Sequence, residues 1–378
     1  MTNVVIAGYA RSPFHLAGKG ELARVRPDDL AAQTIRGLLE KTGVDAAEIE
    51  DVILGCAFPE GEQGLNVARM IGLLADLPLS VGGMTVNRFC GSSMSAIHIA
   101  MGQIQIGAGE AFICAGLESM SRVPMGGYNP LPSPELARKN PGAYMGMGET
   151  AENVAQKYQI TRAEQDAFAV KSQKKAAAAR ESGKLGDEIV PIKTKTGVVS
   201  EDGTIRPDTS VEGLGNLKPA FSQDGSVTAG TSSPLTDGAS AVLVTSEEFA
   251  NRHGLKIMAR IKAIGISGLS PDTMGLGPIG ASQKALERAG LKAGDLDIVE
   301  INEAFASQAI ACIRDLGLKE ETINLDGGAI AIGHPLGATG ARIVGKAAAL
   351  LEREGGRYAL ATQCIGGGQG IATVLERA

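Results

Sequence analysis

The stretch that decides the fold runs from residue 84 to residue 97 and reads M-T-V-N-R-F-C-G-S-S-M-S-A-I, with Cys90 at its centre. A buried strand is predicted to end here, with the last residues Thr85, Val86 and Phe89. Residues 91–93 then turn the backbone. A helix follows, because apolar residues recur at helical spacing at Met94, Ile97 and Met101. The stretch therefore predicts a strand-turn-helix unit with a cysteine on the turn.

A cysteine on such a turn lies where the first free N–H groups of the helix point toward it. Those donors and the helix dipole are expected to favour the thiolate of Cys90, as in the serine elbow of hydrolases. The alternative is that Cys90 is simply a small buried apolar residue, which is a common role of a free cysteine. The Gly-Ser-Ser that follows, together with motifs near the C-terminus, favours a nucleophile.

The composition bounds the protein class. The chain has 378 residues, 44% of them hydrophobic, with 51 glycines, 3% aromatics and a net charge of −6. This length allows two or three domain-sized units, and the Ala/Gly/Val/Ile-rich balance suits packed α/β layers. The negative charge gives no global attraction to nucleic acid or to an anionic membrane. An anionic ligand would need a local basic pocket.

The cysteines and the apolar runs indicate the cellular compartment of the protein. The five cysteines are odd in number, widely spaced and without a C-x-x-C, so neither a disulfide framework nor a zinc site is indicated. The N-terminal apolar run is too short for a signal peptide, and no apolar run reaches membrane-spanning length. We expect a cytoplasmic protein.

A weak internal repeat indicates a duplicated fold. Residues 39–43 (L-E-K-T-G) resemble residues 286–290 (L-E-R-A-G), a shift of 247. At the same shift Ala57-Phe58 aligns with Ala304-Phe305 and Ile113 with Leu360. We expect two βαβ-rich halves that face each other, with a site at their interface. The predicted strands span residues 3–9, 52–54, 111–115, 298–301 and 358–362, and the first helix is capped by Asp28 or Asp29 and ends at Gly43.

Residues 119–227 are predicted to be an insertion between the halves. They begin with a segment rich in Gly, Pro and Met and continue with a helix that Thr161 and Glu164 start as a capping box. The charges of this helix favour a solvated face, and the alternative is a lid that presents basic groups to an anionic ligand. Arg206 is the candidate for that contact.

Three further motifs carry candidate chemistry: I-N-E-A-F at 301–305, G-G-A-I-A-I-G-H-P-L-G-A-T-G at 327–340 and C-I-G-G-G-Q-G at 364–370. His334 lies in a glycine and proline loop that leaves its ring unshielded by bulky neighbours. Cys364 is expected just after a strand, before glycines whose N–H groups can approach a ligand. The run lacks the Gly-Lys-Ser/Thr ending of a P-loop and no G-x-G-x-x-G follows the first strand, which argues against nucleotide phosphate binding. The other histidines read as structural: His15, His98 and His253.

Together, V-N-R-F-C-G-S-S-M, N-E-A-F, G-H-P-L-G-A-T-G and C-I-G-G-G-Q-G resemble the motifs of the thiolases (acetyl-CoA acyltransferases), and the resemblance covers the whole chain. It implies duplicated βαβαβ halves in a five-layered αβαβα sandwich with an inserted loop domain. The expected boundaries are 1–118 plus 228–248 for the N-terminal half, 119–227 for the insertion and 249–378 for the C-terminal half. A homodimer or homotetramer is implied.

The resemblance also implies residue roles. Cys90 would accept the acyl group, His334 would activate its thiol, and Cys364 would move the proton on the acetyl α-carbon. Asn302 would hold a water that stabilises the enolate oxygen, and the N–H groups of Cys90 and Gly366 would form a second oxyanion hole. Coenzyme A would be a substrate, with no prosthetic group or metal. Its site would be lined by Met147, Arg206, Phe221, Ala229, Ser233 and Phe305.

The motif T-A-G-T-S-S-P-L-T-D-G at 228–238 resembles degradative 3-ketoacyl-CoA thiolases more than the biosynthetic type. Biosynthetic members commonly carry His at the position of Gly146, and glycine there suits longer acyl chains. An acetoacetyl-CoA-specific acetyltransferase and a non-catalytic acyl-CoA-binding subunit are the alternatives. A hydratase/3-hydroxyacyl-CoA dehydrogenase partner is also possible in this family.

Overall fold

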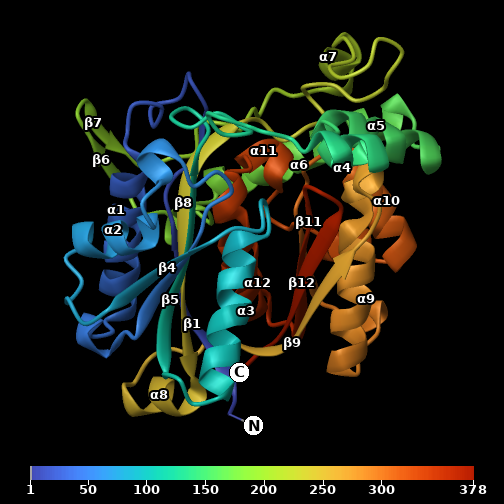
Figure 1. Ribbon diagram of the computed structural model, residues 1–378. Coiled ribbons are helices and arrows are strands. Elements are labelled where there is room, and N and C mark those ends of the chain that lie inside the picture. Colours follow the sequence, from blue (N-terminus) through green and yellow to red (C-terminus); the bar gives the residue numbers. More distant parts are fainter. Residues whose placement is uncertain (1) are drawn as a thin grey trace.

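The computed structural model describes residues 2–378 as an α/β molecule built on one large mixed sheet (Figure 1). Nine strands follow one another across it in the order β10 (Ile298–Ile301), β11 (Tyr358–Ile365), β12 (Gln369–Glu376), β9 (Ala259–Gly268), β1 (Val4–Arg11), β8 (Thr236–Ser246), β5 (Ala111–Ser119), β3 (Asp51–Gly55) and β4 (Gly82–Val86). The short β2 (His15–Leu16) pairs with β8.

The sheet divides into two halves at its centre. β1 and β9 pair there over only two residue pairs, Val5 with Arg260 and Ile6 with Ala259. In Figure 1 the two halves face each other, with helices outside and between them. One outer layer holds α1 (Pro27–Thr42) and α2 (Val67–Leu74), the middle layer α3 (Ser92–Gln105) and α12 (Thr339–Glu354), and the other outer layer α9 (Gly277–Ala289) and α10 (Ala306–Leu316). The predicted αβαβα sandwich is confirmed.

Each interface between layers has its own apolar core. One cluster joins α1 and α2 to the N-terminal half of the sheet, and another joins α9 and α10 to the C-terminal half. The middle cluster holds residues of α3, α12 and both half-sheets, such as Ile97, Val344, Val242 and Ile371. Burial of this middle cluster fixes how the two halves face each other.

The register of the strands confirms the duplication. In the first half β3 lies between β4 and β5, parallel to both, and Val52 pairs with Ile113. In the second half β10 is parallel to β11, where Val299 pairs with Leu360, and Val299 also bridges Ile323. Val299 and Leu360 each lie 247 residues after Val52 and Ile113, which is the shift found in the sequence.

The insertion replaces a short hairpin. β11 and β12 are joined by residues 366–368, whereas the matching β5 and β8 are joined by residues 120–235. This segment contains α4 (Pro134–Lys139), α5 (Met147–Lys157), α6 (Arg162–Glu181), α7 (Val211–Gly215) and the pair β6 (Ile192–Thr194) and β7 (Gly197–Val199). Its helices gather over one end of the sandwich in Figure 1. The predicted capping box of Thr161 and Glu164 starts α6. The domain boundaries given above stay a prediction.

Three local expectations were wrong. β4 is the last strand of the sheet and is only half-buried, and it ends at Val86, so that Phe89 lies outside it and is 39% exposed. The first helix starts after Arg26 with Pro27 at its first position, although it does end at Gly43, in the left-handed region. Pro27 fixes the first helical φ without a side-chain cap. Within residues 2–378 no helix is long and apolar enough to cross a membrane.

Candidate active site

The turn that carries Cys90 is held by its own polar groups. The Ser92 hydroxyl accepts from the Arg88 N–H at 2.8 Å and donates to the Phe89 carbonyl at 2.6 Å. Phe89 has a φ of +43°, a strained value for a residue with a side chain. A Cβ on Gly91 would lie 2.5 Å from Ile365 Cδ1, so the turn packs closely against the end of β11. The turn is thereby fixed against the opposite half of the molecule.

Burial dominates the ionisation of Cys90. The residue is 9% exposed, and burial raises the pKa of its thiol to about 11. The N–H groups of Gly366 and of Cys90 itself lower the pKa and so oppose that rise. The expectation that the turn alone would favour the thiolate is wrong, because two N–H donors do not offset desolvation. Formation of the thiolate needs a base.

Cys364 lies next to this sulfur. It is the penultimate residue of β11, inside the strand rather than after it, and it is fully buried. Burial raises the pKa of its thiol well above the usual value, and a negative charge on Cys90 raises it further. The residues on either side of Cys364 contact the Cys90 turn, because the Gln363 amide donates to the Cys90 carbonyl and Ile365 packs against Gly91. The interface of the halves therefore brings both sulfurs to one site.

His334 is oriented from both sides. It lies between α11 (Ala329–Ile332) and α12, its Nδ1 is 2.6 Å from Thr339 Oγ1, and its Nε2 is 3.4 Å from Asn302 Nδ2. Because the amide nitrogen donates, Nε2 is an acceptor and Nδ1 carries the proton. Thr339 accepts that proton and donates to the Pro335 carbonyl at 3.0 Å. His334 is thus arranged as a base whose unprotonated Nε2 faces Asn302.

The surroundings keep this imidazole uncharged. His334 is 5% exposed rather than unshielded, and burial, with the positive charge of Arg342 second, lowers its pKa to about 3. Gly333 before it has a φ of +105°, where a Cβ would lie 2.7 Å from Thr236 Cγ2. The Thr236 hydroxyl in turn accepts the His334 N–H at 3.1 Å. The glycine before His334 therefore serves a backbone conformation and a close contact with β8.

A buried carboxylate ties the His334 loop to the first half. Glu118, at the end of β5, accepts N–H groups of Ala57 at 2.8 Å and of Gly337 at 2.9 Å. A Cβ on Gly337 would lie 2.4 Å from the Leu117 carbonyl oxygen. Sequence reasoning missed this carboxylate, whose only signal was an acidic residue ending an apolar strand. It also missed two residues at the site itself, Thr339 and Gln363, whose amide donates to the Cys90 carbonyl.

Most residues assigned to coenzyme A lie around Cys364. Met147 and Phe305 share its apolar cluster, and Phe221 packs edge-on against Phe305 with ring centroids 5.9 Å apart. Ser233 donates from its N–H and its hydroxyl to the Ala304 carbonyl, at 3.0 and 3.1 Å. Ala229 is exposed on the turn that precedes it.

Arg206 lies apart from that cluster. Its backbone N–H donates to the α6 residue Gln173 at 2.7 Å, and the residue is exposed. Among residues 2–378 no hydrogen bond or ion pair joins its side chain to the other five residues. Its place near a phosphate stays a prediction.

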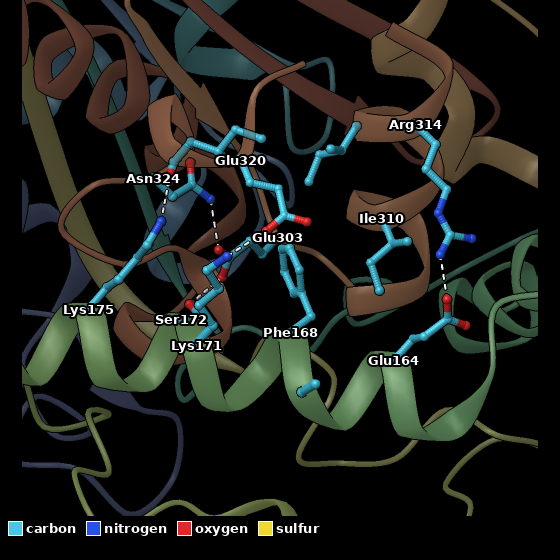
Figure 2. Close-up of a pocket in the computed structure, with 13 residues that line it drawn as sticks. Glu164, Phe168, Lys171, Ser172, Lys175, Glu303, Ile310, Arg314, Glu320 and Asn324 are labelled. Atoms are coloured by element: carbon cyan, nitrogen blue, oxygen red, sulfur yellow. Dashed lines mark hydrogen bonds and ion pairs between the residues drawn. The ribbon is translucent and has the colours of Figure 1, made fainter. Parts of the chain in front are cut away.

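The cavity of about 360 Å³ in Figure 2 lies elsewhere, between α6 and α10. Glu303 forms part of its wall and accepts from Ser172 at 2.6 Å and from Asn324 at 2.8 Å. Lys171 pairs there with Glu320 at 2.5 Å, so this part of α6 does not present unpaired charge as a lid would. Neither Cys90 nor Cys364 lines this cavity. Among residues 2–378 no group of His, Cys, Asp and Glu could hold a metal ion.

Comparison with known proteins agrees with this geometry. Residues 4–248 match the thiolase N-terminal domain and residues 255–377 match the thiolase C-terminal domain. The chain is 46% identical, over the full length of both chains, to a 3-ketoacyl-CoA thiolase of Bacillus subtilis (strain 168) and to one of Vibrio vulnificus (strain CMCP6). It is equally similar, again at 46% over full length, to the 3-oxoadipyl-CoA/3-oxo-5,6-dehydrosuberyl-CoA thiolase of Escherichia coli (strain K12). The chain therefore belongs to the thiolase family.

Proposed function

We propose that this chain catalyses the thiolytic cleavage of 3-ketoacyl-CoA by CoA, giving acetyl-CoA and a shortened acyl-CoA through an acyl-Cys90 intermediate. The observation that carries the proposal is the contact between the turn of Cys90 and the end of β11 that holds Cys364, which places two buried cysteines at the interface of the two halves. The full-length similarity to 3-ketoacyl-CoA thiolases supports the same reaction. Coenzyme A is a substrate here, and no prosthetic group is needed.

In the first half-reaction, His334 Nε2 takes the proton of Cys90. The thiolate attacks the 3-keto carbon, and the N–H groups of Cys90 and Gly366 stabilise the oxyanion, each such donor contributing roughly 3–4 kcal/mol in a dry site. The bond between C2 and C3 then breaks. Its electron pair forms the enolate of acetyl-CoA, which takes a proton from Cys364.

In the second half-reaction, Cys364 takes a proton from the thiol of CoA. The CoA thiolate attacks the acyl group on Cys90, and the departing Cys90 sulfur recovers its proton from His334. Protons and electrons therefore balance within the site. Asn302, which lies beside His334 Nε2, supports the enolate oxygen together with a bound water.

Substrate length is the part of the proposal with alternatives. Gly146 precedes Met147, whose sulfur would lie 3.5 Å from a Cβ on Gly366, and the missing side chain leaves room for a longer acyl chain. Acetoacetyl-CoA-specific synthesis is the alternative. The name of the Escherichia coli relative adds 3-oxoacyl-CoA with a terminal carboxylate as a candidate.

Thiolysis kinetics with acetoacetyl-CoA, 3-ketodecanoyl-CoA and 3-oxoadipyl-CoA test these alternatives. We expect kcat/KM to be highest for the ten-carbon substrate. A strong preference for the four-carbon substrate would reject the degradative assignment, and no adduct on Cys90 after incubation with acetyl-CoA would reject catalysis altogether, leaving a binding subunit.

The assembly belongs to the same proposal. We infer a cytoplasmic homodimer or homotetramer, with a hydratase/3-hydroxyacyl-CoA dehydrogenase as a possible partner. The unpaired edge of β4 supports an oligomer, because an open sheet edge is usually covered. Light scattering after size-exclusion chromatography measures the state, and a monomer would contradict it.

A further inference from the structure

Three side chains at the centre of the sandwich are buried although their polar atoms have no hydrogen-bond partner in the described chain. Arg342 of α12 and Glu300 of β10 are both 0% exposed, and Nη1 lies 3.6 Å from Oε2, beyond hydrogen-bond distance. No protein group among residues 2–378 bonds any guanidinium nitrogen of Arg342, either carboxylate oxygen of Glu300, or the nearby hydroxyl of Tyr9. Buried polar groups are nearly always satisfied, and a buried ion pair is expensive to desolvate. Stability alone gives no reason for this cluster.

The pair lies directly behind the groups that hold His334. Asn302 directly follows β10, two residues after Glu300, and its N–H still donates to the Thr362 carbonyl of β11 at 3.0 Å, so the strand geometry continues and both side chains are on one face. Arg342 follows Thr339 by three residues on α12, so both are on one face of the helix. Asn302 and Thr339 are the two residues that contact the ring nitrogens of His334. The ion pair therefore lies behind the two residues that contact His334, one on each element.

We propose that Arg342 and Glu300 are positioning residues for His334: Arg342 holds the imidazole in its uncharged form before acyl transfer, and Glu300 offsets the imidazolium that forms when His334 takes the Cys90 proton. This inference rests on the proposed function for the role of His334 as a base. It adds a pair of residues that do not touch the substrate. The proton moves only from Cys90 Sγ to His334 Nε2 and back.

The charges around the pair have the signs that this role needs. The positive charge of Arg342 lowers the pKa of His334, second only to burial. Burial raises the pKa of Glu300 to about 7, so its carboxylate is ionised above neutral pH and available to balance a nearby cation. The other charged groups that act on Glu300 are Lys346, which lowers its pKa, and Asp326 and Glu188, which raise it.

The first test is the titration of the histidines in protein labelled with ¹³C at Cε1, followed by NMR from pH 4.5 to 8. Four histidines are present, and His334→Asn assigns the resonance. We expect His334 to stay neutral in the wild type, with the proton on Nδ1. Because burial raises the pKa of Glu300 to about 7, the double variant Glu300→Gln/Arg342→Gln loses mainly the positive charge of Arg342 in the acidic range. The pKa of His334 should therefore rise from about 3 by about two to three units, into the range of the titration. The double variant is used because Arg342→Gln alone would leave a buried carboxylate unpaired.

The second test is the rate of Cys90 acetylation by acetyl-CoA. Glu300→Gln leaves the charge of Arg342 uncompensated, so we expect the rate to fall about tenfold or more, as for a pKa change of one unit, with KM unchanged. The control is Arg260→Gln/Glu247→Gln. This double variant removes a partly buried ion pair, 2.5 Å between nitrogen and oxygen, that does not contact His334, and it should change neither readout.

An unchanged His334 titration in the double variant, or wild-type acetylation by Glu300→Gln, would overturn the proposal. A wild-type protein that cleaves no 3-ketoacyl-CoA would instead refute the proposed function, and the NMR titration would still report on the pair.

Discussion

Replacement of Thr339 by valine removes one hydroxyl from behind the candidate base and keeps the β-branched shape. Thr339 and His334 are both buried, and their hydrogen bond of 2.6 Å is the contact that fixes the Nδ1 proton. In the variant the Nδ1–H has no acceptor. The ring then loses both its preferred tautomer and its orientation toward Asn302.

The size of the effect follows from that single bond. A buried N–H left without a partner costs about 1–3 kcal/mol. If the whole penalty falls on the state in which Nε2 accepts the Cys90 proton, acetylation slows by about 5- to 150-fold. Any part of the penalty that is already present in the resting folded protein instead lowers the free energy of unfolding and does not slow acetylation.

The assay is single-turnover acetylation of Cys90 by acetyl-CoA, followed by intact-protein mass spectrometry, beside urea unfolding of the same samples. Thr339→Ser, which keeps the hydroxyl, is the control and should acetylate within about threefold of the wild type, since its bond to Nδ1 can still form. A Thr339→Val protein that is less stable but acetylates at the wild-type rate would refute the tautomer argument.

Three further predictions concern stability. Gly102→Ala should raise the free energy of unfolding by about 0.5–1 kcal/mol in a urea titration, because Gly102 is inside α3 and its Cβ would meet nothing within 4 Å. Gly337→Ala should lower it by about 1–3 kcal/mol or prevent folding, since its Cβ would lie 2.4 Å from a carbonyl oxygen; wild-type stability would contradict the packing described. His98 has a pKa lowered to about 3 by burial, so its contribution to stability is complete above pH 6.5 and is lost as the pH falls from 6.5 toward 3. The difference in unfolding free energy between wild type and His98→Gln should therefore change by about 1.4 kcal/mol per pH unit between pH 6 and 4, and a constant difference would exclude a buried neutral His98.

Much of the fold was predictable because its signals are local or periodic. The shift of 247 residues predicted two similar halves, whose matching strands are paired in the same way, and the capping box of Thr161 and Glu164 gave the start of α6. Gly43 ends α1 because a left-handed residue is needed there. Such features depend on a few neighbouring residues or on spacing, which the sequence displays directly.

The electrostatics of the site was not predictable in the same way. The high pKa of Cys90 arises from burial among residues distant in the sequence, such as Ala57 and Leu336, which no local pattern reports. The roles of Glu118 and Thr339 depend on segments more than 100 residues away or on the orientation of one ring. Phe89 continues an apolar pattern as if in a strand, but the turn at Cys90 forces it into a left-handed conformation. The role of such a polar side chain depends on which distant segments it contacts in the folded protein.

The division of labour between the two sulfurs can be measured in Cys364→Ala. Acetyl-CoA is added, the acetyl adduct on Cys90 is followed by mass spectrometry, and cleavage of a 3-ketoacyl-CoA is measured in parallel. Cys114→Ala, at a buried cysteine of β5, is the matched control and should retain both activities.

We expect Cys364→Ala to form the Cys90 adduct within about tenfold of the wild-type rate while carbon–carbon cleavage falls about 100-fold or more, the usual contribution of a general acid or base. Equal loss of both half-reactions, or cleavage at the wild-type rate, would contradict the assignment of separate tasks to Cys90 and Cys364.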